Sequence, residues 1–390
     1  MKSWIEISST SLAENFRAVQ AVAGDEVEVL PVIKADAYGH GATTCAPVLV
    51  EAGAKWLGVD DVAEGTAIRE VSPRSDTRLL VMCGMELADA PAIVAHGLTP
   101  VIWTPEHVAA LESAARARGH RISVHLEIET GMGRQGVAPG EDLMRTLERL
   151  ASSQWIDCEG IMTHLCCSES AGAGITETQR ERFASALDQA IGAGLHPELI
   201  HLGNTSAVDE GSTMAWIRDT AKSLGARAMV RTGFAIYGHC LEIEGTHAHA
   251  ALLAPRLSPV LCWKTRIIGV REVAAGATIG YGATFVAAHP MRLALLPVGY
   301  ADGFRRAASS GIGNGWVVIA GQRAPVVGRV SMNLTVVDVS SIDDVNEGMD
   351  VVLLGEGVTA EDHARWSSTI AYDILCGIKV RPPVEMTLLG

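Results

Sequence analysis

The chain has 390 residues, of which 48% are hydrophobic, and a formal net charge of −14. This length and apolar content are enough for two folded domains with buried cores, which argues against an intrinsically disordered chain. The acidic charge, with basic residues scattered along the sequence, argues against a nucleic-acid partner, because an extended run of phosphates would not be neutralised.

The eight cysteines are spread along the chain, with Cys166 and Cys167 as neighbours. Their spacing is neither that of a disulfide framework nor that of a Cys-x-x-Cys pair, which favours a reducing cytoplasm. The first residues, MKSWIEISSTSLAENF, lack the apolar stretch of a signal peptide, and no later segment has the uninterrupted apolar length of a membrane span. We therefore expect a cytoplasmic protein without a membrane partner.

Short apolar runs alternate with segments of helical period from about residue 28 to residue 231. This alternation is typical of strand-helix units around a parallel sheet. Eight strands are expected, at 29–33, 56–59, 78–83, 99–102, 122–128, 159–163, 199–202 and 228–230. The segments between them include 104–119 and 176–194, each with a capping residue in front and glycine behind. Eight such units predict an α/β fold, an eight-stranded parallel (β/α)8 barrel over residues 8–238.

The pattern changes after Tyr237. Alternating apolar runs separated by glycine turns follow, namely LCWKTRIIGV, RLALLPVGY, GWVVIAG, TVVDVS and DVVLLG. Such runs are typical of antiparallel strands. We expect a mostly antiparallel β-domain over residues 239–390, joined by residues 1–7, with the boundary near 238–250.

Polar side chains follow five of the expected barrel strands. Lys34 follows the first, Arg134 the fifth, His164 the sixth, His201 and Asn204 the seventh, and Arg231 the eighth. Active sites of such barrels form where the carboxyl ends of the strands converge. One histidine or arginine in this position is usually a structural group, so the agreement of five strands is what predicts a site.

The segment VIKADAYGHG, residues 32–41, places Lys34 directly after an apolar strand. A partly desolvated lysine can lose its proton and form an imine with an aldehyde, whereas a lysine on the barrel rim would keep only its aliphatic stem buried. These ten residues resemble the cofactor-lysine motif of the alanine racemase family, which uses pyridoxal 5'-phosphate. Further matches follow in the family's order: TGMGRQG (130–136), MTHL (162–165), HLGNTSA (201–207), VRTGFAIYG (230–238), IGYGATF (279–285), VGYADGF (298–304) and GRVSMN (328–333).

The resemblance implies an enzyme that racemises an amino acid with pyridoxal 5'-phosphate bound to Lys34 as a Schiff base. Lys34 would be the base on one face of the substrate α-carbon, and Tyr281 the base on the other. Inversion requires two faces, because a proton removed from one side is replaced from the opposite side. In the family Tyr281, Tyr300 and Met332 come from the second subunit of a homodimer, so we expect a shared active site.

The resemblance also assigns the cofactor contacts. The phosphate would be bound by Tyr38, Thr205 and the backbone N–H groups of Gly233 and Phe234, with Asn204 beside them. Arg231 would face the pyridine nitrogen, His164 would stack on the ring, and His201 would continue the chain from Arg231. Arg134 would reach the ring hydroxyl and, with Tyr300, Met332 and Asn333, the substrate. We expect no metal ion.

Three positions depart from the family's pattern. Glu127 stands where the usual member has a lysine, often carbamylated, and we interpret its carboxylate as a replacement for the carbamate charge near Arg134; it could also be a plain strand residue. Asn333 replaces an aspartate, and Val380 stands where a carboxy-terminal tyrosine is usual. Valine leaves space beside the substrate, so serine or a broader set of amino acids is the alternative to L-alanine.

Three other functions are alternatives to racemisation. A decarboxylase of the same fold type would place an acidic residue at the pyridine nitrogen, where this chain has Arg231. A non-catalytic pyridoxal-phosphate carrier or regulatory protein would need Lys34 but not Tyr281. A purely structural barrel would leave the convergent lysine, arginines and histidines unexplained.

Overall fold

A computed structural model describes residues 2–71, 76–172, 174–245, 251–380 and 387–389. Contacts between Cα atoms divide the chain into two units. The barrel unit comprises Ser11–Ala37 and Ala42–Ser258, and the β unit comprises Met1–Thr10, Tyr38–Gly41 and Pro259–Gly390. Within the described ranges, the helices are too short or too polar to cross a membrane.

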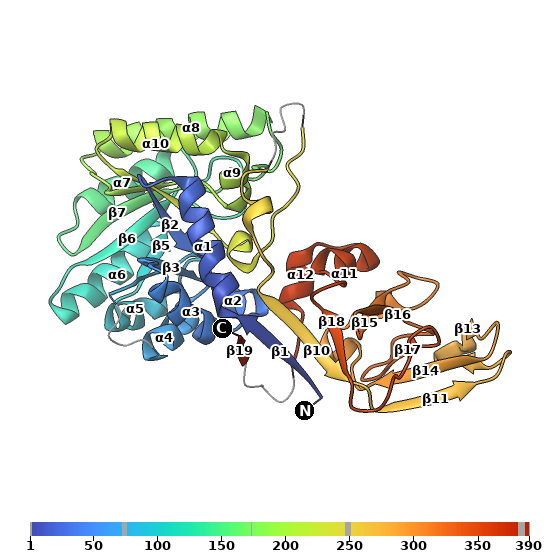
Figure 1. Ribbon diagram of the computed structural model, residues 1–390. Coiled ribbons are helices and arrows are strands. Elements are labelled where there is room, and N and C mark those ends of the chain that lie inside the picture. Colours follow the sequence, from blue (N-terminus) through green and yellow to red (C-terminus); the bar gives the residue numbers. More distant parts are fainter. Residues whose placement is uncertain (1, 72–75, 173, 246–250, 381–386, 390) are drawn as a thin grey trace. The chain divides into compact units, whose positions relative to one another are not determined.

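The barrel unit is built on eight parallel strands, with helices around them (Figure 1). In the order of their hydrogen bonds they are β2 (Val27–Pro31), β9 (Arg227–Thr232), β8 (Leu199–His201), β7 (Ile156–Met162), β6 (Ile122–Glu127), β5 (Thr99–Ile102), β4 (Arg78–Val81) and β3 (Trp56–Val59). A parallel bridge between Val32 and Gly58 joins the two ends of this sheet, and the Ile33 N–H donates to the Gly58 carbonyl at 2.7 Å. The predicted eight-stranded parallel barrel is confirmed.

The strands are apolar because both of their faces are covered. β3 and β5 are buried along their whole length, as expected where helices cover one face and the barrel interior the other. Gly58 of β3 is required by this packing, since a Cβ there would lie 2.5 Å from Met82 Sδ and 2.7 Å from Leu30 Cδ2. The interior is therefore filled by side chains of neighbouring strands.

One helix precedes the first barrel strand, and the others lie between the strands along the chain, as the sequence pattern predicts. They are α1 (Ser9–Ala23), α2 (Lys34–Gly39), α3 (Ala42–Glu51), α4 (Val62–Val71), α5 (Ala90–His96), α6 (Pro105–Arg118), α7 (Glu141–Ala151), α8 (Gly174–Gly192), α9 (Thr205–Glu210) and α10 (Ser212–Ser223). At the start of α6 the Thr104 side chain accepts from the His107 N–H at 3.2 Å, and Gly119, with φ 77°, ends the helix. These are the capping signals read from the sequence.

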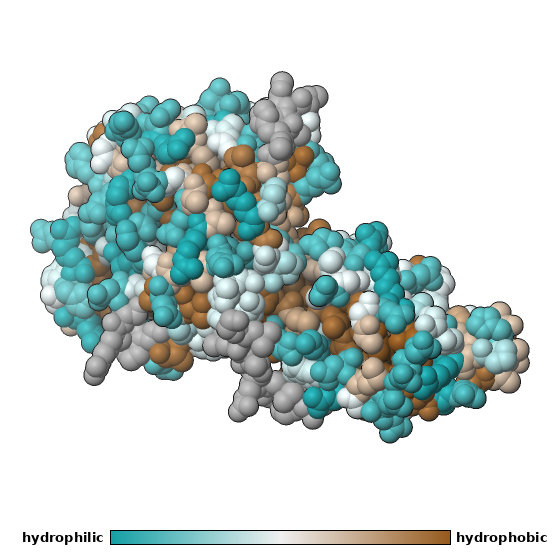
Figure 2. Space-filling view, viewed as in Figure 1, coloured by the Kyte–Doolittle hydropathy of each residue, from teal (hydrophilic) through white to brown (hydrophobic). Residues whose placement is uncertain are grey.

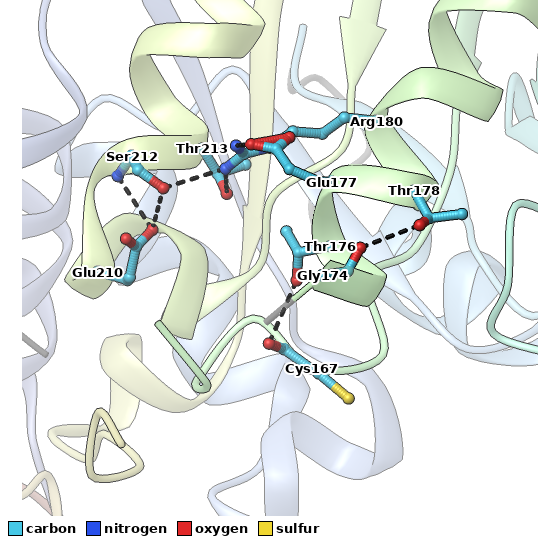
Figure 3. A network of polar contacts seen from close by, with 9 residues as sticks. All are labelled: Cys167, Gly174, Thr176, Glu177, Thr178, Arg180, Glu210, Ser212 and Thr213. Carbon is cyan, nitrogen blue, oxygen red and sulfur yellow. Dashed lines mark hydrogen bonds and ion pairs between the residues drawn. The ribbon is translucent and has the colours of Figure 1, made fainter. Parts of the chain in front are cut away.

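A buried arginine ties two of the outer helices together (Figure 3). Arg180 of α8 donates to Thr213 Oγ1 at 2.6 Å and to Ser212 Oγ at 3.1 Å, both in α10, and to Glu177 Oε1 at 2.9 Å. A buried guanidinium is tolerated only with such partners. Because α8 follows β7 and α10 follows β8 along the chain, this contact braces the part of the barrel that carries His164 and Asn204.

The β unit is mostly antiparallel, as predicted. Its largest sheet has the order β16 (Gln322–Pro325), β15 (Trp316–Ile319), β18 (Asp350–Leu354), β10 (Leu261–Arg266), β1 (Ser3–Ser8) and β19 (Thr387–Leu389). The pair of β1 and β19 is parallel, and the other pairs are antiparallel.

Two smaller antiparallel sheets complete this unit. β11 (Gly269–Val273), β14 (Met291–Leu296) and β17 (Thr335–Asp338) form one, and β12 (Thr278–Ile279) with β13 (Phe285–Val286) forms the other. Ile279, Met291, Leu293 and Val327 pack into a small core between them. Two helices, α11 (Ala360–Ser367) and α12 (Ala371–Cys376), lie near the end of the chain.

Candidate active site

Lys34 opens an unusual turn at the carboxyl end of β2. Ala35, Asp36, Ala37 and Tyr38 have φ angles of 52°, 52°, 55° and 55°, so α2 winds in the left-handed sense. This conformation costs roughly 1–2 kcal/mol per non-glycine residue. Strain of this kind persists only where the surroundings impose it, and it concentrates at functional sites.

Hydrogen bonds hold the left-handed turn in place. The Asp36 carboxylate accepts from the Ala42 N–H at 2.7 Å, and the Asp36 N–H donates to Glu64 Oε1 at 3.1 Å. The buried Ala37 donates its N–H to the Ile33 carbonyl at 2.8 Å. The turn therefore sets the direction in which the side chains at its two ends leave the backbone.

The Lys34 amine has two polar neighbours that the sequence analysis did not single out. Lys34 Nζ lies 3.5 Å from Cys83 Sγ, which follows β4, and 4.0 Å from Asp60 Oδ1, which follows β3. Burial, together with Asp60, raises the pKa of the Cys83 thiol against the opposing charge of Lys34. The thiol is therefore protonated at neutral pH, and the Asp60 carboxylate is the negative charge beside Lys34.

Arg231 is the centre of a buried cluster at the ends of β7, β8 and β9. Its Nη1 lies 3.1 Å from His201 Nδ1, and its Nη2 lies 3.0 Å from His164 Nδ1 and 2.9 Å from the Thr163 carbonyl oxygen. A guanidinium can only donate, so both histidine nitrogens accept and both rings are neutral. The structure thus brings together the three residues that the resemblance linked.

The pKa values of these groups agree with this arrangement. Burial, helped by the charge of Arg231, lowers the pKa of His164 to about 3. Burial also lowers the pKa of His201 well below its usual value. The pKa of Arg231 is lowered by burial to about 10, which leaves it protonated at neutral pH. The positive charge of the cluster therefore resides on Arg231.

One donor of Arg231 is left over. Its Nε is buried and has no hydrogen-bond partner among the residues that the structure describes. A buried N–H without an acceptor is costly, so a ligand with an acceptor atom would satisfy this donor. The Nε atoms of Arg180 and Arg305 also lack a partner among these described residues, so it is the position of Arg231 in the strand-end cluster that makes its Nε relevant to binding. An unprotonated aromatic nitrogen, such as that of a pyridine ring, fits this donor.

The loops after β8 and β9 meet at Thr205. Its Oγ1 accepts from the Ala235 N–H at 3.3 Å and retains a hydroxyl hydrogen for donation. Gly233 and Phe234 precede Ala235, directly after β9. Asn204 caps α9, because its Oδ1 accepts from the Ala207 N–H at 3.1 Å and from the Ser168 hydroxyl at 2.7 Å. Asn204 Oδ1 thus stabilises the start of α9.

Glu127 is buried at the end of β6, and its contact is with a residue that the sequence analysis did not name. Gln135 donates from Nε2 to Glu127 Oε2 and, at 2.8 Å, to the Met82 carbonyl oxygen. Burial raises the pKa of Glu127, against the Gln135 hydrogen bond and the charges of Arg231 and Arg134. Arg134 is exposed on the turn after β6. Glu127 therefore acts on two arginines through its charge.

The remaining predicted residues belong to the β unit and are unusually exposed. Tyr281 is 71% exposed, Met332 55% and Tyr300 44%. The Tyr300 N–H donates to the Ser331 carbonyl at 3.1 Å, which places Tyr300 beside the segment of Met332. Asn333 is exposed and Val380 is half-buried. Apolar surface is visible among polar areas over this unit in Figure 2.

The chain matches two family models over most of its length. The model of the alanine racemase N-terminal domain matches residues 7–240, and that of the alanine racemase C-terminal domain matches residues 260–386. The chain is 34% identical over 388 residues to an alanine racemase of Symbiobacterium thermophilum, which covers 98% of this chain and 96% of the relative.

Solved structures agree with these matches. The alanine racemase from Streptomyces coelicolor is 31% identical, with a TM-score of 0.86, covering 100% of this chain and 98% of that one. An alanine racemase from Bartonella henselae, solved with covalently bound pyridoxal phosphate, is 22% identical and shares the fold, with a TM-score of 0.81 over 100% of this chain and 99% of that one.

The barrel with its strand-end lysine, arginine and histidines, followed by the antiparallel β unit, defines an isomerase of the amino-acid racemase class. The matched models cover both parts of the sequence, and the relatives are aligned over nearly their full length. The chain belongs to the alanine racemase family.

Proposed function

We propose that the protein racemises an amino acid, with L-alanine as the first candidate, by two bases acting on opposite faces of a substrate held on pyridoxal 5'-phosphate. The observation that carries this proposal is the unsatisfied Nε donor of Arg231, set between two neutral histidines. An acid at this position would protonate the pyridine nitrogen. A guanidinium only donates a hydrogen bond to it.

The residues present fit the cofactor. The Lys34 amine is the point of attachment, and Tyr38, Thr205 and the N–H groups of Gly233 and Phe234 would bind the phosphate at the loops where such barrels commonly bind one. When bound, pyridoxal phosphate withdraws electrons from the substrate α-carbon and makes its proton removable. Arg231 keeps the ring nitrogen unprotonated, which limits this withdrawal and favours rapid return of the proton over side reactions.

Two side chains would move the proton. Lys34 Nζ takes or returns it on one face, and the phenol oxygen of Tyr281 from a second copy of the chain does so on the other. A tyrosine has an ordinary pKa of about 10, so its anion needs a donor nearby. His164 accepts from Arg231 at Nδ1 and therefore carries its hydrogen on Nε2, where it can stabilise that anion.

Substrate binding rests on a smaller set. Arg134 would bind the substrate carboxylate together with Met332. The negative charge of Glu127 would attract the Arg134 guanidinium and so limit its movement. Asn333 and Val380 leave the side-chain pocket wider and less charged than in the usual family member. We therefore propose activity toward serine or further small amino acids beside alanine.

We also propose a homodimer, which is supported by the exposure of Tyr281, Tyr300 and Met332. Large side chains that are open on the surface of one copy are available to complete the site of another. We also propose a cytoplasmic location, which is supported by the eight cysteines, all of them free thiols.

The test is incubation of the purified holoenzyme with L- or D-alanine in deuterated water, followed by α-hydrogen exchange and optical rotation. We expect both exchange and inversion in the wild type, and exchange without inversion for one enantiomer in Tyr281→Phe. If pyridoxal phosphate is bound but no amino acid exchanges its α-hydrogen, the protein is a carrier and the proposal fails.

A further inference from the structure

A line of polar groups, all buried except Arg78 at its far end, continues from Arg231 through the barrel. His201 Nε2 lies 2.8 Å from His125 Nδ1, and His125 Nε2 lies 3.8 Å from Glu159 Oε2. Glu159 in turn accepts two hydrogen bonds from Arg78, at 2.9 and 2.6 Å. We call Arg231, His201, His125, Glu159 and Arg78 the interior chain.

The hydrogens of the interior chain have one consistent arrangement. Arg231 donates to His201 Nδ1, so the hydrogen of His201 is on Nε2. That nitrogen donates to His125 Nδ1, so the hydrogen of His125 is on its own Nε2, directed at the Glu159 carboxylate. All the N–H groups therefore point away from Arg231, and each ring is neutral.

At the far end of the interior chain, the Glu159 carboxylate is negatively charged. Burial alone would raise the pKa of Glu159, but His125 and the paired guanidinium of Arg78 lower it to about 2. The separation of 3.8 Å between His125 Nε2 and Glu159 Oε2 is longer than a hydrogen bond, and His125 Nε2 has no hydrogen-bond partner among the described residues. The nearest acceptor for its hydrogen is the negatively charged Glu159 carboxylate, so the two groups interact through that charge. Arg78 and Glu159 line a surface hollow of about 640 Å³.

The backbone makes room for this arrangement. Val124 pairs with Cys158 and His125 with Gly160, so Glu159 is the extra residue of a bulge in β7. Bulges redirect a side chain. At Gly160 a Cβ would lie 2.7 Å from the His125 ring, so any larger residue would collide with it. The fully buried ring thus occupies a space that an apolar side chain could have filled at less cost.

We propose that His125 and Glu159 are positioning residues, which fix the hydrogens of the interior chain and so hold the Arg231 guanidinium, still charged, with Nε toward the ligand. That Nε is directed at a bound ligand rests on the proposed function, whereas the arrangement of hydrogens along the interior chain does not. In Glu159→Gln, Arg78 would take the amide oxygen and turn the NH2 group toward His125. The amide N–H of the new glutamine and the Nε2–H of His125 would then face each other as two donors. The arrangement of hydrogens from Arg231 to His125 would be lost.

The first test is nitrogen-15 NMR of the histidines in the holoenzyme, with assignment by single substitutions. We expect His125, His201 and His164 to be neutral between about pH 6 and 8, with hydrogen on Nε2. A charged ring, or a hydrogen on Nδ1 of His125 or His201, would overturn the proposal. This measurement does not depend on turnover, so it stands even if no amino acid is racemised.

The second test compares Glu159→Gln with Glu112→Gln. Glu112 pairs with Arg149 in the same barrel, and the exposures of this pair (10% and 41%) match those of Glu159 and Arg78 (9% and 38%). We expect Glu159→Gln to lower kcat about tenfold, with little change in KM and a shifted absorption band of bound pyridoxal phosphate. Glu112→Gln should stay within about twofold of the wild type. Equal losses in both variants would show a merely structural role.

Discussion

Glu127 links substrate binding and stability in one buried carboxyl group. Burial raises its pKa, and a carboxyl whose pKa is higher in the folded than in the unfolded state opposes folding once it ionises. Its stabilising contribution is present below about pH 4.3, the ordinary value, and is lost as the pH rises through the raised folded value. Once it is ionised, the carboxylate therefore costs stability, and its charge then faces Arg134 and Arg231.

Glu127→Gln should separate these two effects. We expect kcat/KM to fall about tenfold or more, because the charge facing the arginines is removed. The free energy of unfolding, measured in urea, should exceed that of the wild type near pH 7 and approach it near pH 4. Glu112→Gln is the kinetic control. Unchanged kinetics, or a loss of stability at neutral pH, would refute this account of Glu127.

Val380 is the residue that tests substrate range. Val380→Tyr places a large side chain at a half-buried position, which we propose to lie beside the substrate. We expect the ratio of kcat/KM for serine to that for alanine to fall by about tenfold, since added bulk excludes the larger substrate first. Chiral chromatography of a panel of L-amino acids measures this. If the wild type turns over alanine alone, the interpretation of Val380 and Asn333 is wrong.

The sequence predicted the site residues that follow the barrel strands, but it did not predict the residues that contact them. Lys34 and Arg231 could be found, because each directly follows or ends an apolar run and lies in a long motif. Asp60 and Cys83 could not, because their roles depend on contacts with Lys34, which is distant in sequence. Gln135 stood within the quoted TGMGRQG motif, but only its hydrogen bond to Glu127 gives it a meaning.

At the scale of elements, the left-handed turn of α2 makes a prediction with an internal control. Ala35 is exposed with φ 52°, whereas Ala109 is exposed within the right-handed helix α6. Ala35→Gly should raise the free energy of unfolding by up to about 1 kcal/mol, since glycine adopts positive φ without a Cβ penalty. Ala109→Gly should lower it by about 1 kcal/mol.

Ala35→Gly should also weaken the binding of pyridoxal phosphate, because a more flexible turn holds Lys34 and Tyr38 less firmly in position. Thermal denaturation and titration with the cofactor measure both effects. A loss of stability in Ala35→Gly as large as that in Ala109→Gly would show that the turn is not strained.

The elements differ in how well sequence predicts them. The strands at 56–59 and 99–102 match β3 and β5, because a fully buried strand is a continuous apolar run with clear ends. β7 begins at Ile156, three residues before the expected 159, since its first residues alternate and carry the exposed Asp157. The left-handed turn was not predicted, because its positive-φ residues before Gly39 are not glycines.

At the scale of the whole molecule, the proposed site needs residues from both units and from two copies of the chain. Lys34 and Arg231 belong to the barrel unit, whereas Tyr281 and Met332 belong to the β unit. The 71% exposure of Tyr281 supports the proposal that it completes a partner's site. The order of the motifs along the sequence identified the family, but it does not show how two copies of the chain would assemble.

Mixing two inactive variants tests this central claim most directly. Lys34→Ala lacks the attachment point for the cofactor and Tyr281→Phe lacks the opposite base, yet a mixed dimer of the two would contain one complete site. After unfolding and refolding as an equal mixture, we predict recovery of about one quarter of the wild-type racemase activity, because half of the dimers are mixed and each has one intact site of two. No recovery in a mixture that contains dimers would contradict the account.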